Sequence, residues 1–274
     1  EKVKSLPDFF DASNLAVTQH EATSKDGTKI PYFQVMRKDA KMDGKNPTIL
    51  YGYGGFEVSQ VPTYSGFVGN GWLAKGGVWV LSNLRGGGEF GPAWNRVARR
   101  EGRQKTHDDY AAVAEDLIRR KVTSPAKLGI LGGSQGGLLV SATMLQRPEL
   151  FGAVVATVPL MDMKRYHKLL AGHSWMGEYG DPDKPEDWAF ISKYSPYQNV
   201  LRGRAYPKML ITTSTRDDRV HPGHARKMAA RMQQFGYDTT YFEYTEGGHG
   251  SGTTPAQTAY TWAFIYTFFA KSLM

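Results

Sequence analysis

The feature that most constrains this chain is a glycine-rich turn between a strand-like and a helix-like segment. The turn reads Gly132-Gly133-Ser134-Gln135-Gly136-Gly137; it follows the apolar run 127–131 and opens the helical pattern 135–146. The Ser of a G-x-S-x-G turn has a strained backbone, so its neighbours must be small. The N–H groups of the following helix point toward any oxygen that becomes negative beside it. The motif therefore predicts Ser134 as a nucleophile, with a glycine-rich turn carrying an incidental Ser as the alternative.

Strand-like and helix-like segments alternate along most of the 274 residues. Segments 15–24 and 28–37 predict an antiparallel pair around the turn Lys25-Asp26-Gly27. Further strands are expected at 48–53, 78–84, 128–131, 153–158, 209–213 and 240–244, and helices at 108–121, 135–146, 221–235 and 255–273. This order predicts an α/β protein with a mostly parallel central sheet, helices on both faces and an antiparallel N-terminal edge. Together with the strand–turn–helix at Ser134, it predicts the α/β-hydrolase fold.

Residues 161–200 are the exception to this alternation. They lack clean periodicity and are rich in Trp, Tyr, Asp and Pro. The aromatic residues argue against disorder, and a long irregular excursion in a compact domain is usually functional. We therefore expect residues 1–274 to form a single domain in which 161–200 is a cap-like segment lining a pocket.

Charge and composition exclude several classes of protein. The 34 Lys and Arg against 26 Asp and Glu give a net charge of +8, but the basic residues are spread along the chain. The runs Arg99-Arg100 and Arg119-Arg120-Lys121 are short and typical of helix ends. The longest apolar stretch, 152–161, is about half the length of a membrane helix. We therefore expect a soluble protein that binds neither nucleic acid nor membrane; a cytoplasmic location and a periplasmic or secreted one both fit.

A Ser nucleophile needs a base and an acid that orients the base, in the chain order Ser, Asp or Glu, His. Asp217-Asp218 follows the strand at 209–213, and spacing leaves both carboxylates open. After the next strand comes Glu246-Gly247-Gly248-His249-Gly250-Ser251-Gly252. The glycines leave this loop free to bring the imidazole to Ser134, so His249 is the expected base. His107, in contrast, is expected just before a helix.

Two further patterns are interpreted as structural. Residues 86–91 match G-x-G-x-x-G, but Pro92 and Trp94 follow where a dinucleotide site needs a closely packed helix start. His221 and His224 suggest a metal pair, but no third ligand accompanies them, and the start of a helix explains both. We therefore expect no cofactor and no metal.

Several segments together resemble the catalytic domain of the prolyl oligopeptidase family, serine peptidases that cut short peptides after proline. They are Ser24–Pro31, Tyr51–Phe56, Asn83–Glu89, the Ser134 turn, Asp217–Val220 and Gly247–Gly250. The resemblance implies Asp217 as the acid of the triad. It also implies an oxyanion hole formed by the Tyr53 hydroxyl and the backbone N–H of Gln135. Gln135 replaces the Asn of many family members, which leaves a side-chain contact with substrate open.

The resemblance further implies a proline pocket in the cap, where residues 172–180 match the family's pocket segment. Trp175 is expected to stack on the pyrrolidine ring of the substrate. The apolar wall would be completed by Phe56, Tyr179 and Val220, with Leu160 and Met176 modifying its shape.

Arg219 matches a family arginine that binds a backbone carbonyl of the substrate. An ion pair of Arg219 with Asp218 or Glu246 is the alternative.

These observations predict a serine endopeptidase that hydrolyses peptide bonds on the C-terminal side of proline in short peptides through an acyl-enzyme. An esterase, or a dipeptidyl or acylaminoacyl peptidase of the same fold, is the alternative, although no Glu-Glu pair is present to anchor a free amine. A non-catalytic hydrolase-like binding module is the remote alternative. The chain begins with Glu1 and has no counterpart of the family's β-propeller and N-terminal segment, so we expect a fragment whose partner is that missing portion.

Overall fold

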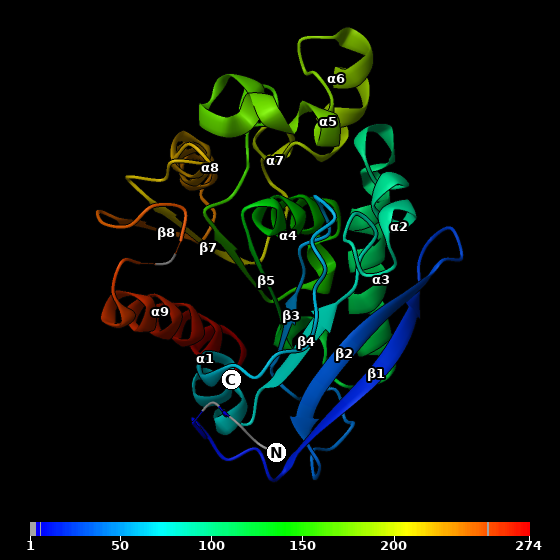
Figure 1. Ribbon diagram of the computed structural model, residues 1–274, viewed down its shortest axis with the longest axis vertical. Helices are drawn as coiled ribbons and strands as arrows, with labels where there is room; N and C mark the ends of the chain where they lie inside the picture. Colours follow the sequence, from blue (N-terminus) through cyan, green and yellow to red (C-terminus); the bar gives the residue numbers. More distant parts are fainter. Residues whose placement is uncertain (1–3, 6, 251) are drawn as a thin grey trace.

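An eight-stranded β-sheet forms the centre of the molecule (Figure 1). The computed structural model describes residues 4–5, 7–250 and 252–274, so Glu1 and Ser251 lie outside the described residues. The strands follow the order β1-β2-β4-β3-β5-β6-β7-β8. Their bounds are β1 Leu15–Thr23, β2 Lys29–Arg37, β3 Thr48–Tyr51, β4 Val78–Ser82, β5 Leu128–Gly133, β6 Ala153–Thr157, β7 Lys208–Ser214 and β8 Thr239–Tyr244.

The sheet is antiparallel only at its N-terminal edge. β1 pairs with β2, and β2 with β4, in antiparallel register, with Leu15 opposite Arg37 and Tyr32 opposite Ser82. The pairs from β4 through β8 are all parallel. The expected mostly parallel sheet with an antiparallel N-terminal edge is therefore confirmed.

Helices cover both faces of the sheet. Successive side chains of a strand point to opposite faces, and on each face they pack into an apolar core with a different set of helices. Leu50 and Ile130 belong to the core that includes residues of α3, α4 and α8. Ile49 and Leu131 belong to the core that includes residues of α9. The helices outside the cap are α1 Gly66–Gly71, α2 Pro92–Arg96, α3 Gln104–Arg119, α4 Gln135–Gln146, α8 Gly223–Gln234 and α9 Pro255–Leu273. Short 3-10 turns occupy Leu73–Lys75, Arg100–Gly102, Pro125–Lys127 and Pro148–Leu150.

Helix α3 begins four residues earlier than the sequence pattern predicts. His107 therefore lies inside the helix, where it is buried and shares a hydrogen bond with the Thr143 hydroxyl across 3.3 Å. The expectation that His107 precedes the helix was wrong, because the polar first turn hides the helical period.

Among the described residues, no helix has the length and hydropathy needed to cross a bilayer.

The cap-like segment 161–200 consists of short helical turns at one end of the sheet, at the top of Figure 1. The turns are η5 Tyr166–Lys168, η6 Leu170–Trp175, α5 Met176–Tyr179, α6 Pro185–Ile191, η7 Ser192–Tyr194 and α7 Pro196–Asn199. Each is too short to produce a period in the sequence. Side chains of these turns share an apolar cluster with Leu138 and Ala142 of α4. The segment therefore packs over α4, the helix that directly follows Ser134.

Candidate active site

Ser134 lies in the turn between β5 and α4 and has a strained backbone. Its φ of 57° and ψ of −115° are rare for a residue other than glycine and cost about 1–3 kcal/mol. A Cβ on Gly132 would lie 2.1 Å from the Gly136 carbonyl oxygen, and a Cβ on Gly136 would lie 2.6 Å from the Gly52 carbonyl oxygen. The turn therefore tolerates only glycine at both positions, and the half-buried Ser134 is held at the N-terminus of α4.

Asp217 and His249 form a hydrogen-bonded pair beyond the ends of β7 and β8. The His249 Nδ1 lies 2.8 Å from Asp217 Oδ2 and 3.0 Å from Oδ1. Asp217 Oδ1 also accepts the backbone N–H groups of Arg219 and Val220, each at 2.9 Å. The Asp217 side chain is fully buried, whereas Asp218 is exposed. Of the two carboxylates that spacing left open, the geometry places Asp217 against the imidazole.

Ser134 and this pair lie at the same end of the sheet. Each follows the carboxyl end of its strand, and β5, β6, β7 and β8 are parallel neighbours. Within the described residues, however, no hydrogen bond joins the Ser134 hydroxyl to the His249 ring. Gly247 in the His249 loop has a φ of 84°, and a Cβ on Gly250 would meet no atom within 4 Å. Catalytic hydrogen bonds are often long or poorly aligned before substrate binds, so the absence of this contact does not exclude His249 as the base.

Tyr53 follows β3 and contacts the Ser134 side chain. Burial raises the pKa of the Tyr53 hydroxyl, and the positive charge of Arg219 opposes this rise. Tyr53 is therefore a neutral hydrogen-bond donor at ordinary pH. The structure therefore brings the Tyr53 hydroxyl to the Ser134 side chain.

The side chain of Gln135 is fully buried and bound within the protein. Its Oε1 accepts the Tyr179 hydroxyl, and its Nε2 donates to the carbonyl oxygens of Tyr53 and Gly54, both at 3.4 Å. Both ends of the side-chain amide are therefore bound within the protein. The first N–H groups of a helix have no acceptor within the helix, so the backbone N–H of Gln135 is suited to bind an oxygen at Ser134.

The expected pocket residues gather in one apolar cluster over α4. Its members include Leu160, Tyr179 and Val220, with Phe56 and Trp175 packed against them. The Phe56 ring lies edge-on to Trp175 at 6.4 Å and to Tyr179 at 5.6 Å between ring centroids. Leu160, Tyr179 and Val220 are buried, whereas Phe56 and Trp175 are only partly buried. Phe56 and Trp175 therefore present the accessible apolar surface, and the other three lie behind it.

The Arg219 side chain is exposed. In the described part of the chain it makes no ion pair with Asp218 or Glu246, and Glu246 instead accepts a hydrogen bond from Gln257. The described residues therefore do not form the ion pair of the alternative interpretation, and the positive charge of Arg219 acts on the Tyr53 hydroxyl.

Sequence reasoning missed a buried ion pair beneath this site, between Arg103 and Glu178. Arg103 Nη1 donates to the Gly54 carbonyl oxygen at 2.8 Å, and Glu178 Oε1 accepts the Phe56 N–H at 2.9 Å. The signal available in the sequence was Glu178 itself, a lone carboxylate in the aromatic and glycine-rich stretch 172–180.

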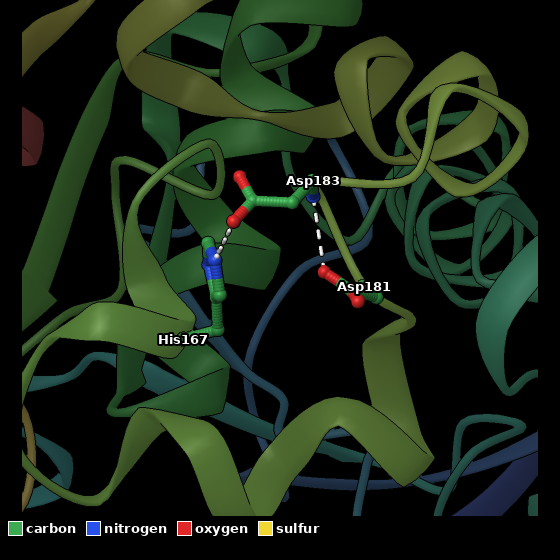
Figure 2. Close-up of side chains that lie close together, drawn as sticks. All are labelled: His167, Asp181 and Asp183. Carbon is green, nitrogen blue, oxygen red and sulfur yellow. Dashed lines mark hydrogen bonds and ion pairs between the residues drawn. The ribbon is translucent and has the colours of Figure 1, made fainter.

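One group of side chains in the cap has the composition of a metal site (Figure 2). Potential ligand atoms of His167, Asp181 and Asp183 all lie within 4.8 Å of one another. The His167 Nε2 lies 3.0 Å from Asp183 Oδ2, which also pairs with the Lys168 ammonium at 2.8 Å. The buried His167 Nδ1 has no partner among the described residues, whereas a metal-bound His donates this second N–H to an acceptor. We assign no metal to this cluster.

The eight-stranded, mostly parallel sheet and the strained turn at Ser134 before α4 define an α/β-hydrolase domain. The chain belongs to the prolyl oligopeptidase family, whose model matches residues 67–274. An uncharacterized peptidase of Sinorhizobium fredii is 52% identical over 274 residues, which cover 100% of this chain and 38% of that protein. The prolyl endopeptidase of Elizabethkingia miricola is 39% identical over 252 residues, covering 90% of this chain and 36% of that protein.

A solved structure of a post-proline cleaving enzyme from Rickettsia typhi matches the fold with a TM-score of 0.95 and 48% sequence identity. The match covers 100% of this chain and 39% of that one. The chain therefore spans well under half the length of the relatives that it matches.

Proposed function

We propose that residues 1–274 act as one catalytic domain of a serine endopeptidase that cleaves peptide bonds on the C-terminal side of proline. The observation that carries the proposal is the Asp217–His249 hydrogen bond, which lies at the same end of the parallel strands as the strained Ser134. The names of the relatives from Elizabethkingia miricola and Rickettsia typhi support the post-proline specificity.

In this mechanism the Ser134 oxygen attacks the carbonyl carbon of the scissile bond, and His249 Nε2 accepts the hydroxyl proton. The His249 loop must bring Nε2 to about 2.6–3.2 Å from that hydroxyl when substrate binds. Asp217 holds the Nδ1–H and stabilises the imidazolium that forms. His249 then gives the proton to the leaving amine, and water hydrolyses the acyl-enzyme.

The negative oxygen of the tetrahedral intermediate would be bound by the Tyr53 hydroxyl and the backbone N–H of Gln135. Both donors are fixed before the reaction, so they need little reorganisation as charge develops. Burial keeps the phenol in its neutral, donating form, since it raises the pKa of Tyr53.

Substrate recognition would depend on the half-buried Phe56 and Trp175. A pyrrolidine ring stacked on Trp175, with Phe56 as the adjoining wall, buries apolar area without immobilising a flexible group. Arg219 would bind a backbone carbonyl of the residue before proline. Short peptides are the proposed substrates, and a β-propeller in the additional length seen in relatives is the proposed partner that limits access.

The proposal is tested with the full-length protein, a blocked Gly-Pro amide and simple acyl esters. We expect cleavage after proline, stoichiometric labelling of Ser134 by a fluorophosphonate, and no turnover by Ser134→Ala with the fold intact. Turnover of esters alone would favour the esterase, and absence of labelling would favour the non-catalytic binding module. Peptidase activity retained by Ser134→Ala would overturn the assignment of the nucleophile.

A further inference from the structure

A buried ion pair joins the cap to the segment that carries Tyr53. Arg103, the residue before α3, has a fully buried side chain, and its Nη2 donates to Glu178 Oε1. The Glu178 side chain is only 6% exposed. Desolvation of two buried charges offsets much of their attraction, so such a pair is a weak source of net stability. We therefore look for the role of this ion pair in the other groups that the two side chains bind.

Those groups belong to a strained backbone segment, residues 54–57. Gly54, Phe56 and Glu57 all have positive φ values, of 63°, 54° and 57°. Non-glycine residues adopt this conformation only where the surroundings impose it. Arg103 binds the Gly54 carbonyl at 2.8 Å, and Glu178 binds the Phe56 N–H at 2.9 Å. The ion pair therefore holds the strained segment on both sides of Gly55.

The contacts of Arg103 and Glu178 form a network that extends to Tyr53 and Gln135, the two residues that carry the candidate oxyanion donors. The Arg103 guanidinium lies 5.2 Å from the centre of the Tyr179 ring, and the Tyr179 hydroxyl donates to the Gln135 side chain. Gln135 in turn donates to the Tyr53 carbonyl oxygen. The charges of Arg103 and Glu178 also act on the Tyr53 hydroxyl.

At the cap, the contacts of Arg103 and Glu178 reach the apolar cluster against which Trp175 packs. Glu178 and Tyr179 belong to α5, which begins directly after Trp175. A movement of α5 when a ring enters beside Trp175 would therefore act on the backbone next to Tyr53 through two charge-assisted hydrogen bonds.

We propose that Arg103 and Glu178 are positioning residues that align the Tyr53 hydroxyl and the Phe56 ring, and that couple filling of the pocket to assembly of the oxyanion site. This inference rests on the proposed function of the Ser134 site. A misplacement of a catalytic group by about 1 Å costs on the order of a hundredfold in rate. The coupling should therefore raise kcat, as well as lower KM, for a substrate that fills the pocket.

The test is the double variant R103M/E178M of the full-length protein, which removes both charges so that neither is left buried alone. The matched control is R100M/D187N, because Arg100 and Asp187 also join the cap to the region before α3 but bind none of residues 53–57. With a blocked Gly-Pro amide, we expect kcat of R103M/E178M to fall roughly ten- to hundredfold. We expect the control to stay within about threefold of the parent.

A second readout separates positioning from a merely structural role. Ser134 adds to the carbonyl carbon of a blocked peptide aldehyde ending in proline, and the resulting hemiacetal oxygen occupies the oxyanion site. R103M/E178M should lose affinity for this aldehyde by about the same factor as kcat, and keep its affinity for the peptide acid within about threefold. R103M/E178Q, which restores an acceptor for the Phe56 N–H, should recover part of the lost kcat.

Equal kcat and aldehyde affinity in R103M/E178M and the control would overturn this inference while leaving the proposed function intact. If R103M/E178M does not fold, R103K replaces it, since Lys keeps the charge but lacks the fork that binds Gly54 and Glu178 together. A loss of about tenfold in the kcat of R103K is expected, and an unchanged kcat would overturn the inference. A parent protein that neither reacts with a fluorophosphonate nor cleaves the amide would overturn the proposed function as well.

Discussion

The Asp217 carboxylate lies 2.8 Å from the Nδ1 of His249. A carboxylate only accepts hydrogen bonds, so this contact requires the proton on Nδ1 and leaves Nε2 as the acceptor in the neutral ring. The pair therefore presents the tautomer that a general base for Ser134 needs.

Asp217→Asn should lower kcat by about ten-thousandfold, because the Asn amide can donate to Nδ1 and favour the opposite tautomer of His249. Steady-state kinetics with a blocked Gly-Pro amide measure the loss, with circular dichroism to check the fold. Asp218→Asn, at the exposed neighbouring position, is the control and should retain near-parent activity. A large loss in Asp218→Asn with little loss in Asp217→Asn would reverse the assignment of the acid.

Tyr53→Phe should reduce kcat by about a hundred- to a thousandfold with little change in KM, since the lost hydrogen bond forms only in the transition state. Tyr51→Phe is a matched control, because the Tyr51 ring stacks on Trp79 at 5.8 Å on the other side of Gly52. The comparison of kcat and KM for the two variants checks the role of the phenol. An equal, small effect in both would remove Tyr53 from the oxyanion site.

The stability of the chain should fall in acid through His224. This buried residue accepts the backbone N–H groups of Met161 and Asp162 at the start of the cap, at 3.2 and 3.0 Å. Burial lowers the pKa of His224 from 6.5 to about 4. The unfolded chain therefore binds more protons below about pH 6.5, and the free energy of unfolding decreases as the pH falls toward 4.

For one histidine this loss amounts to about 3 kcal/mol at or below pH 4. His224→Asn keeps an acceptor for the cap backbone but does not titrate, so its free energy of unfolding should depend less on pH between 4 and 6.5. Urea unfolding at a series of pH values measures both slopes, with the exposed His173→Asn as control. Parallel slopes for the parent and His224→Asn would contradict the prediction.

Much of the fold was predictable because its strands, turns and helices follow from patterns of neighbouring residues in the sequence. The hairpin formed by β1 and β2, and the strand–turn–helix at Ser134, depend on glycine turns and alternating apolar residues that lie close together in the sequence. Helix α1 was not predicted, because three of its six residues are glycines, which disfavour a helix on intrinsic propensity.

The candidate site was less predictable, because its supporting contacts join residues far apart in the sequence. Arg103 and Glu178 are 75 positions apart, and although Glu178 stands out as a lone carboxylate in the stretch 172–180, no local pattern indicates Arg103 as its partner. Likewise, nothing in the sequence indicates that the Gln135 side chain accepts a hydrogen bond from the Tyr179 hydroxyl. Such contacts require knowledge of how the cap packs on α4.

The last prediction concerns specificity. Trp175→Ala removes part of the accessible apolar wall of the pocket, so the preference for proline over alanine before the scissile bond should fall by at least about tenfold in kcat/KM. Trp188→Ala controls for general weakening of the cap, because Trp188 packs on the same apolar cluster while its ring lies 4.7 Å from the Lys164 ammonium. Competition between paired proline and alanine substrates in one reaction measures the preference directly. If both variants shift the preference equally, the change arises from the cap as a whole, and Trp175 does not determine specificity.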